Sequence, residues 1–300
     1  MKIQSQIGLT LFFLLLYLVF REEIAAYQYV ICVIAILLFG IPHGAIDHIL
    51  HRKFSKNKDY PTHRKFITWY VLSMFAYFVV WFLFPFKAFL LFIALALYHF
   101  GQEFVEELDI KIDSKAPILL LGSSIMIMPL LLHYQDLAAF LLEVTKVNLP
   151  DLNPQTTGNF ALLIPAVSIA YFTRSYWKGQ LSKSLYFRIL AYLVLWVIIY
   201  VLTPFLIGFT LYFVLHHSIN SMKHQYESLA KLSKQYSLKA YFKDVSVLTL
   251  VSYFGIGFLL LISGVQTWEY LTLYALVFIS VLTLPHMLVF DDFYNERSAT

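Results

Sequence analysis

The chain has 300 residues, of which 60% are hydrophobic and 13% are charged, and its formal net charge is +4. A soluble globular domain has roughly a quarter of its residues charged, so this composition excludes an ordinary water-soluble domain. The small net charge indicates no nucleic-acid partner. The single cysteine, Cys32, excludes a disulfide framework within the chain.

Long stretches without Asp, Glu, Lys or Arg follow one another along the chain. Most are close to the roughly 20 residues that a helix needs to cross the hydrocarbon core of a bilayer. The longest, residues 189–222, exceeds one crossing, and Pro204 and Gly208 near its middle favour a break into two helices. We therefore predict an all-α, polytopic integral membrane bundle in which residues 1–300 form one transmembrane domain. About ten spans are expected, over residues 3–20, 24–48, 66–86, 88–104, 116–135, 158–173, 189–203, 205–222, 245–265 and 270–290.

The basic residues are distributed unequally between the two sets of loops. If both termini are cytoplasmic, the outer loops contain only Arg21, Lys87 and Lys146, and every other Lys and Arg is on the inner side. This asymmetry follows the positive-inside rule and predicts cytoplasmic termini. Residues 223–243 alternate lysine with apolar residues, and we expect an amphipathic helix there, in contact with anionic lipids of the inner surface.

Six of the ten histidines lie near the inner ends of four expected helices. These four helices all run from the outside inward, so their histidines share a similar depth in the membrane. One such histidine is more often a helix–helix hydrogen-bonding residue, but four helices each supplying one indicate a metal site. The six residues are His43, His48, His99, His216, His217 and His286.

Two of these histidines have a carboxylate four residues later, His43 with Asp47 and His99 with Glu103. Residues i and i+4 share one face of a helix. The carboxylates are therefore candidates to orient an imidazole by accepting its free N–H, or to bind the metal directly. Ordinary helix-end carboxylates remain the alternative.

Four short segments, in order, resemble one known family. The first, Gly40-Ile-Pro-His-Gly-Ala-Ile-Asp-His48, is similar to the signature Gly-Leu-Pro-His-Gly-Ala-Leu-Asp. The others are Tyr98-His-Phe-Gly-Gln-Glu-Phe104, His217-Ser218 and Leu284-Pro-His-Met-Leu-Val-Phe-Asp291. Together they resemble the Brp/Blh family of bacterial and archaeal β-carotene 15,15′-dioxygenases.

The resemblance implies a multi-span enzyme of the bacterial or archaeal inner membrane with non-haem ferrous iron (Fe2+) bound by histidines. Such enzymes take a carotenoid from the lipid phase and use O2 to split its central double bond into two molecules of retinal, which microbial rhodopsins consume. The family's ligands fall on His43, His99 and His217.

The chain departs from the family at one ligand position, where Ser221 stands four residues after His217 in place of a second histidine. Water is one candidate for the fourth ligand. The candidate residues for the fourth ligand or for support of the ligands are His286, His216, His48, Glu103, Asp47 and Ser221.

Other functions stay open at this stage. A family member altered at Ser221 would act on another carotenoid or apocarotenoid, or would bind carotenoid or retinal without turnover. A covalent retinal protein is not expected, because no lysine lies within a span. A di-iron desaturase needs about eight ligands, more than the histidines at this depth supply. A bis-histidine haem protein and a transporter are the remaining alternatives.

Overall fold

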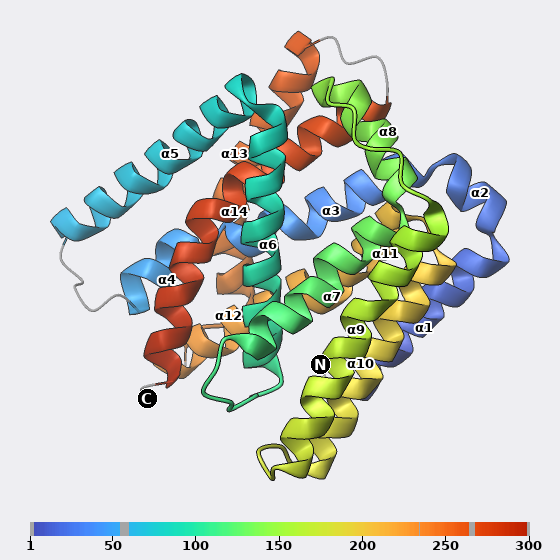
Figure 1. Ribbon diagram of the computed structural model, residues 1–300. Helices are drawn as coiled ribbons and strands as arrows, with labels where there is room; N and C mark the ends of the chain where they lie inside the picture. Colours follow the sequence, from blue (N-terminus) through green and yellow to red (C-terminus); the bar gives the residue numbers. More distant parts are fainter. Residues whose placement is uncertain (1–2, 55–59, 234, 264–267, 299–300) are drawn as a thin grey trace. The chain divides into compact units, whose positions relative to one another are not determined.

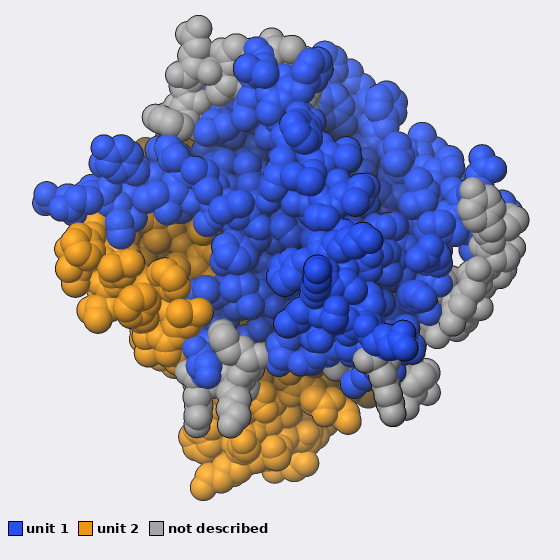
Figure 2. Space-filling view, turned by 180° about the vertical axis from the view of Figure 1, so that it is seen from behind, with its two compact units in different colours: residues 1–6, 22–83, 213–300 blue, residues 7–21, 84–212 orange. Residues whose placement is uncertain are grey.

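The computed structural model describes residues 3–54, 60–233, 235–263 and 268–298, and within these ranges the chain forms helices and no strand (Figure 1). The all-α prediction is therefore confirmed for the described residues. The chain divides into two compact units, coloured separately in Figure 2. The first comprises residues 1–6, 22–83 and 213–300, and the second comprises residues 7–21 and 84–212. A single transmembrane domain over residues 1–300 stays a prediction.

Two helices at the start of the chain are cut by the boundary between the units, α1 (Ile3–Val19) and α2 (Arg21–Ala26). The first unit further contains α3 (Gln28–Gly44), α4 (Asp47–Phe54), α5 (Tyr60–Leu83), the π-helix η1 (Phe213–Ser218), α12 (Ile219–Leu232), α13 (Leu238–Ser263) and α14 (Trp268–Ser298). The second contains α6 (Pro85–Glu107), α7 (Ala116–Leu132), α8 (Tyr134–Thr145), α9 (Pro154–Trp177), α10 (Lys183–Leu202) and α11 (Phe205–Tyr212).

The long helix α14 contacts three other helices of the first unit. It packs against α3, α4 and α5, while α3 also contacts η1, α12 and α13. The indole N–H of Trp81 on α5 donates a hydrogen bond to the Ser280 hydroxyl on α14, with the two atoms 2.6 Å apart. Part of the core is an apolar cluster from α4, α12, α13 and α14 that includes Leu50, Leu229 and Phe290. One side of the segment 223–243, expected on the membrane surface, is thus buried within this unit.

The second unit is built on a close contact between α6 and α7, and α7 also packs against α9 and α10 (Figure 1). Two glycines make this approach of the backbones possible. A Cβ atom on Gly101 of α6 would lie 2.0 Å from the carbonyl oxygen of Ile118, and one on Gly122 of α7 would lie 2.0 Å from that of Leu97. Small residues at a crossing let two membrane helices come close enough for their backbones to pack.

Six described helical segments are long and apolar enough to cross a membrane, or seven if the bent pair α7–α8 is one span. This fits a membrane protein. The ten-span count stays a prediction, and four of its segments are not among these six. α1 is short, α7 and α8 meet at an angle of 81°, and the segment 205–222 is divided among α11, η1 and α12. The fourth, the expected span 245–265, ends at residues outside the described ranges.

Large apolar side chains are exposed on the candidate spans. On α5, Trp69 is 69% exposed and Phe82 is 80% exposed. Contiguous exposed apolar surface is unusual for a protein in water and is the ordinary state of a helix facing lipid.

Candidate metal-binding site

The first histidine of the site, His43, lies at the end of α3. The helix contains Pro42 and ends at Gly44, and both residue types disfavour continuation of a helix. The N–H of Ala45 closes the last turn by donating to the carbonyl oxygens of Ile41 and Pro42. The next helix begins only at Asp47.

His217 belongs to the π-helix η1, an uncommon element that is frequent at functional sites. Asn220 donates a hydrogen bond from its side-chain nitrogen to the His216 carbonyl oxygen at 2.8 Å, and Gln6 donates to the Asn220 side-chain oxygen. The first bond gives a backbone carbonyl of the irregular turn the partner that a buried polar group requires, and the second holds the Asn220 side chain that donates it.

His43 and His217 meet within the first unit. Their Nε2 atoms are 3.1 Å apart, and the side chains are only 6% and 1% exposed. Imidazole nitrogens bind metals at about 2.1 Å, so two ligands at about a right angle are separated by about 3 Å. The pair therefore fits two ligands of one metal ion.

The ring of Phe213 lies beside both imidazoles, with ring centroids 6.0 Å from His43 and 5.2 Å from His217. Gly40 allows this, because a Cβ atom there would lie 2.8 Å from the edge of the Phe213 ring. The glycine of the Gly-Ile-Pro-His segment thus makes room for an apolar wall beside the histidine pair.

The backbone of His43 is fixed by a glutamine. Gln225 donates from Nε2 to the His43 carbonyl oxygen at 2.8 Å and to the Ser221 hydroxyl at 3.3 Å. The Tyr241 hydroxyl donates to the other end of the same amide, Oε1, at 2.7 Å. The Ser221 hydroxyl is therefore part of a buried network that connects α3, α12 and α13.

Asp47 pairs with His286 of α14, whereas its spacing in the sequence predicts His43 as its partner. The Nδ1 atom of His286 lies 2.9 and 2.8 Å from the two carboxylate oxygens, and the Tyr70 hydroxyl donates to one of them at 2.9 Å. The i,i+4 rule fails here because α3 ends before Asp47. The His286 ring nevertheless adjoins that of His43, with centroids 4.8 Å apart.

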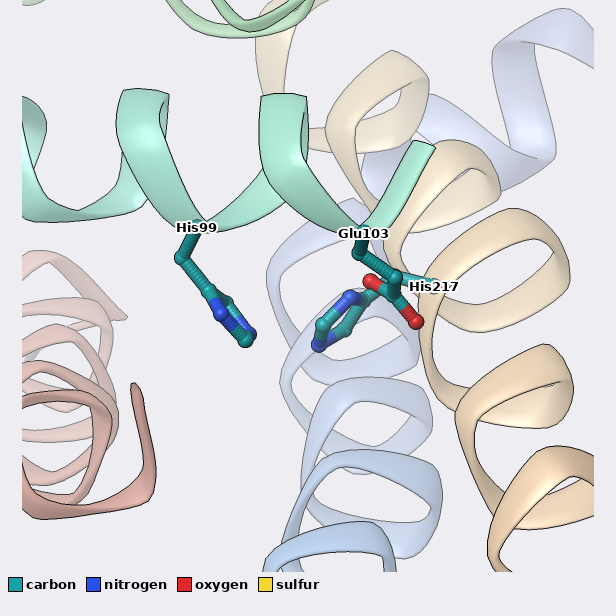
Figure 3. A group of neighbouring side chains, drawn as sticks. All are labelled: His99, Glu103 and His217. Carbon is teal, nitrogen blue, oxygen red and sulfur yellow. The ribbon is translucent and has the colours of Figure 1, made fainter. Parts of the chain in front are cut away.

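His99 and Glu103 belong to the second unit, where both are buried on α6. They extend from the same side of the helix, as Figure 3 shows, and a ligand atom of each lies within 4.8 Å of the other. Gly101 lies between them in sequence and faces α7 instead. This pair can supply a histidine and a carboxylate to a metal ion.

Two other candidate residues are His48 and His216. His48 lines a surface hollow with Lys243 and Asp244, among apolar side chains of α4, α5 and α13. His216 is buried beside His217 on η1.

The interpretation of the sequence did not identify Gln225, Tyr241 and Tyr70. Gln225 follows Ser221 by four residues, which is a weak signal in a segment that was expected on the membrane surface. Tyr70 and Tyr241 have no local signal, because each meets its partner only through packing between helices.

A model of the protein family described as beta-carotene 15,15'-dioxygenase matches residues 34–294. The matched range contains all nine candidate site residues. No curated protein and no solved structure matches the chain.

Proposed function

Because the chain belongs to the β-carotene 15,15′-dioxygenase family, we propose that it is a non-haem iron enzyme that cleaves the central double bond of β-carotene with O2. The buried pair of His43 and His217 carries the proposal, because their Nε2 atoms are 3.1 Å apart and suit one metal ion. The products are two molecules of retinal. One C=C bond breaks and each of its carbons takes one oxygen atom of O2, so no separate reductant is consumed.

The proposed ligands of the ferrous ion are His43, His99 and His217. The first and third are supported by their contact and burial. His99 is supported by the family resemblance, by its burial and by Glu103 beside it on α6. Bound ferrous iron supplies a redox-active centre with open positions for O2, and neutral imidazoles suit such an ion.

The residues around the histidine pair hold it in place and exclude water. Gln225 holds the His43 backbone through its carbonyl oxygen, and Tyr241 holds the Gln225 amide in the required orientation. Phe213 covers one side of the two imidazoles. A rigid and apolar setting of this kind lowers the cost of arranging the ligands when the ion binds.

We propose a location in the inner membrane of a bacterium or archaeon, with ten spans and both termini in the cytoplasm. Six candidate spans and the exposed apolar faces support a membrane protein. β-Carotene dissolves in lipid rather than in water, so it would enter between helices from the bilayer. Retinal released there is available to a microbial rhodopsin.

A second candidate is a carotenoid- or retinal-binding protein without turnover, or an enzyme for another carotenoid or apocarotenoid. Ser221 supports it, because its hydroxyl accepts a hydrogen bond from Gln225 at a position where the family has a histidine. This candidate also predicts binding of a polyene, but not conversion of β-carotene to retinal.

Expression in β-carotene-producing bacterial cells, followed by pigment extraction and chromatography, separates the two candidates. We expect retinal and loss of carotene with the wild-type protein and with the control His63→Ala, but not with His43→Ala or His217→Ala. Equal retinal from all four proteins would contradict the proposed site. Unchanged carotene with an iron-containing wild-type protein in the membrane would favour the second candidate.

A further inference from the structure

The surface hollow of the first unit, among α4, α5 and α13, has a volume of about 370 Å³, within the usual range of small-molecule pockets. Its lining combines three polar and four apolar side chains: His48, Lys243 and Asp244, with Ile49, Ile67, Val247 and Leu248. Ile49 also belongs to the buried apolar cluster of α4, α12, α13 and α14, so the hollow lies against a packed core. Such a lining suits a ligand with one polar and one apolar part.

The polar and apolar side chains are separated along α13. Lys243 precedes Val247 by four residues, and Asp244 precedes Leu248 by four. Residues four apart lie on one face of a helix, about 6 Å apart along its axis. The charged pair is therefore one turn closer to the start of α13 than the apolar pair, which is 62% and 41% exposed. One turn further, Val251 is also 62% exposed, so the apolar side of the hollow continues along the helix.

Basic residues extend the polar end of the hollow. Each of the three helices has an exposed basic residue about one turn from a residue of the lining: Arg52 on α4, Arg64 on α5 and Lys239 on α13. The end of α4 and the beginning of α5 lie together, because the His51 ring stacks on the Phe66 ring with centroids 3.8 Å apart. These three residues and Lys243 outnumber the one carboxylate of the lining, Asp244.

The carboxylate of Asp244 already has a partner, because the Tyr236 hydroxyl donates to its Oδ2 atom at 2.8 Å. The polar end of the hollow therefore has an excess of positive charge and attracts an anion, while its apolar end opens onto exposed apolar side chains. Basic pockets between membrane helices bind the headgroups of anionic lipids in this way.

We propose that this hollow binds one anionic phospholipid, with the phosphate beside Lys243 and an acyl chain over Val247 and Leu248. Exposed apolar faces on helices fit to cross a membrane favour a lipid over a soluble anion as the occupant. The inference requires a membrane setting but not the reaction proposed above, so either can fail without the other.

The test is a titration of the purified protein in detergent with dioleoylphosphatidylglycerol, with bound lipid counted by native mass spectrometry. Dioleoylphosphatidylcholine, which has the same chains but no net charge, should bind at least about fivefold more weakly. Each basic residue near a lipid surface contributes about fivefold to binding. Lys243→Gln should therefore weaken phosphatidylglycerol binding about fivefold, and Arg52→Gln/Lys243→Gln about 25-fold. The matched control is Lys183→Gln at the start of α10 in the second unit, which should bind as the wild type does.

A variant of unchanged charge tests the apolar end. Val247→Trp fills the hollow from an exposed position and should weaken phosphatidylglycerol binding several-fold. The thermal midpoint of each variant without added lipid shows whether the fold is kept. Equal phosphatidylglycerol affinity in the wild type and in the double variant would overturn the inference, as would equal affinity of the wild type for the two lipids. Glycerol phosphate that binds as tightly as the lipid would also overturn it, because the apolar end would then contribute nothing.

Discussion

At the scale of single residues, Gln225 holds a proposed ligand without being one. Its amide donates to the carbonyl oxygen of His43 and accepts from the Tyr241 hydroxyl, and all three groups are buried. A buried polar group left without its partner costs about 1–3 kcal/mol. The effect of this glutamine on the site should therefore be visible in both stability and metal binding.

We predict that Gln225→Leu lowers the thermal midpoint and weakens iron binding at least several-fold, measured by unfolding and metal titration of the protein in detergent. Tyr241→Phe is the matched control, because it removes one hydroxyl but keeps the Gln225 bond to His43. It should have the smaller effect on iron. Unchanged iron affinity in Gln225→Leu would contradict a positioning role.

The proposed ligands themselves give a second prediction at this scale. His43→Ala, His99→Ala and His217→Ala should each lower iron content, measured by mass spectrometry of the purified protein, at least tenfold, because each removes one of the three assigned imidazoles. His63→Ala should retain the wild-type content. Full iron loading in all three ligand variants would refute the assignment.

Sequence spacing indicated the candidate histidines but not all of their partners. The prediction that they share one depth rests on the expected direction of each helix, which needs only the order of spans. The partner of Asp47 does not follow in this way, because the helix break after Gly44 cancels the i,i+4 relation and packing against α14 replaces it. Gln225 and Tyr241 likewise become visible only when α3, α12 and α13 are assembled.

At the scale of the helices, the contact between α6 and α7 depends on its two glycines. The obstacle to a side chain at Gly101 is the backbone carbonyl of Ile118, which cannot rotate away as a side chain can. Gly101 faces α7, whereas His99 and Glu103 extend together from α6, so any displacement of this helix also moves the pair.

We therefore predict that Gly101→Ala destabilises the protein by about 1–3 kcal/mol or more, the usual cost of overpacking. Thermal unfolding in detergent measures the effect. The control is Gly158→Ala in α9, where a Cβ atom meets nothing within 4 Å, and which should be neutral or slightly stabilising. A stability of Gly101→Ala equal to that of the control would show that the close crossing is absent.

The positions of most helices were predictable from the sequence, because a long apolar stretch without charges indicates a helix that can span a membrane. The expected span 66–86 corresponds to α5, and 189–203 corresponds to α10. The π-helix η1 was not predictable, because its extra residue per turn leaves no mark in hydropathy. The expected span 116–135 ends at the 81° bend between α7 and α8, whereas the helix α8 beyond the bend was not predicted.

At the scale of the whole molecule, composition and hydropathy were sufficient to predict an all-α chain with helices that fit a membrane, but not to count the spans. The distribution of basic residues among the loops predicts on which side of the membrane each loop lies. The outer loops of the ten-span arrangement contain only three basic residues, Arg21, Lys87 and Lys146. A change of one span would place the later basic loops on the opposite side and remove this asymmetry.

We predict that reporters fused to either end of the chain are active only in the cytoplasm. The measurement is a pair of fusions, one reporter active inside the cell and one active outside, at each terminus. Activity of the outside reporter at one terminus would show an odd number of spans and contradict the ten-span topology.

The central claim concerns one reaction, and its most direct measurement is the ratio of retinal formed to β-carotene consumed by the purified, iron-loaded protein with O2. Cleavage at the central double bond predicts two molecules of retinal for each β-carotene, and none in His217→Ala. A longer and a shorter aldehyde in place of retinal would mean cleavage at another bond. Bound β-carotene that is not consumed would mean binding without turnover, and either result would contradict the proposed function.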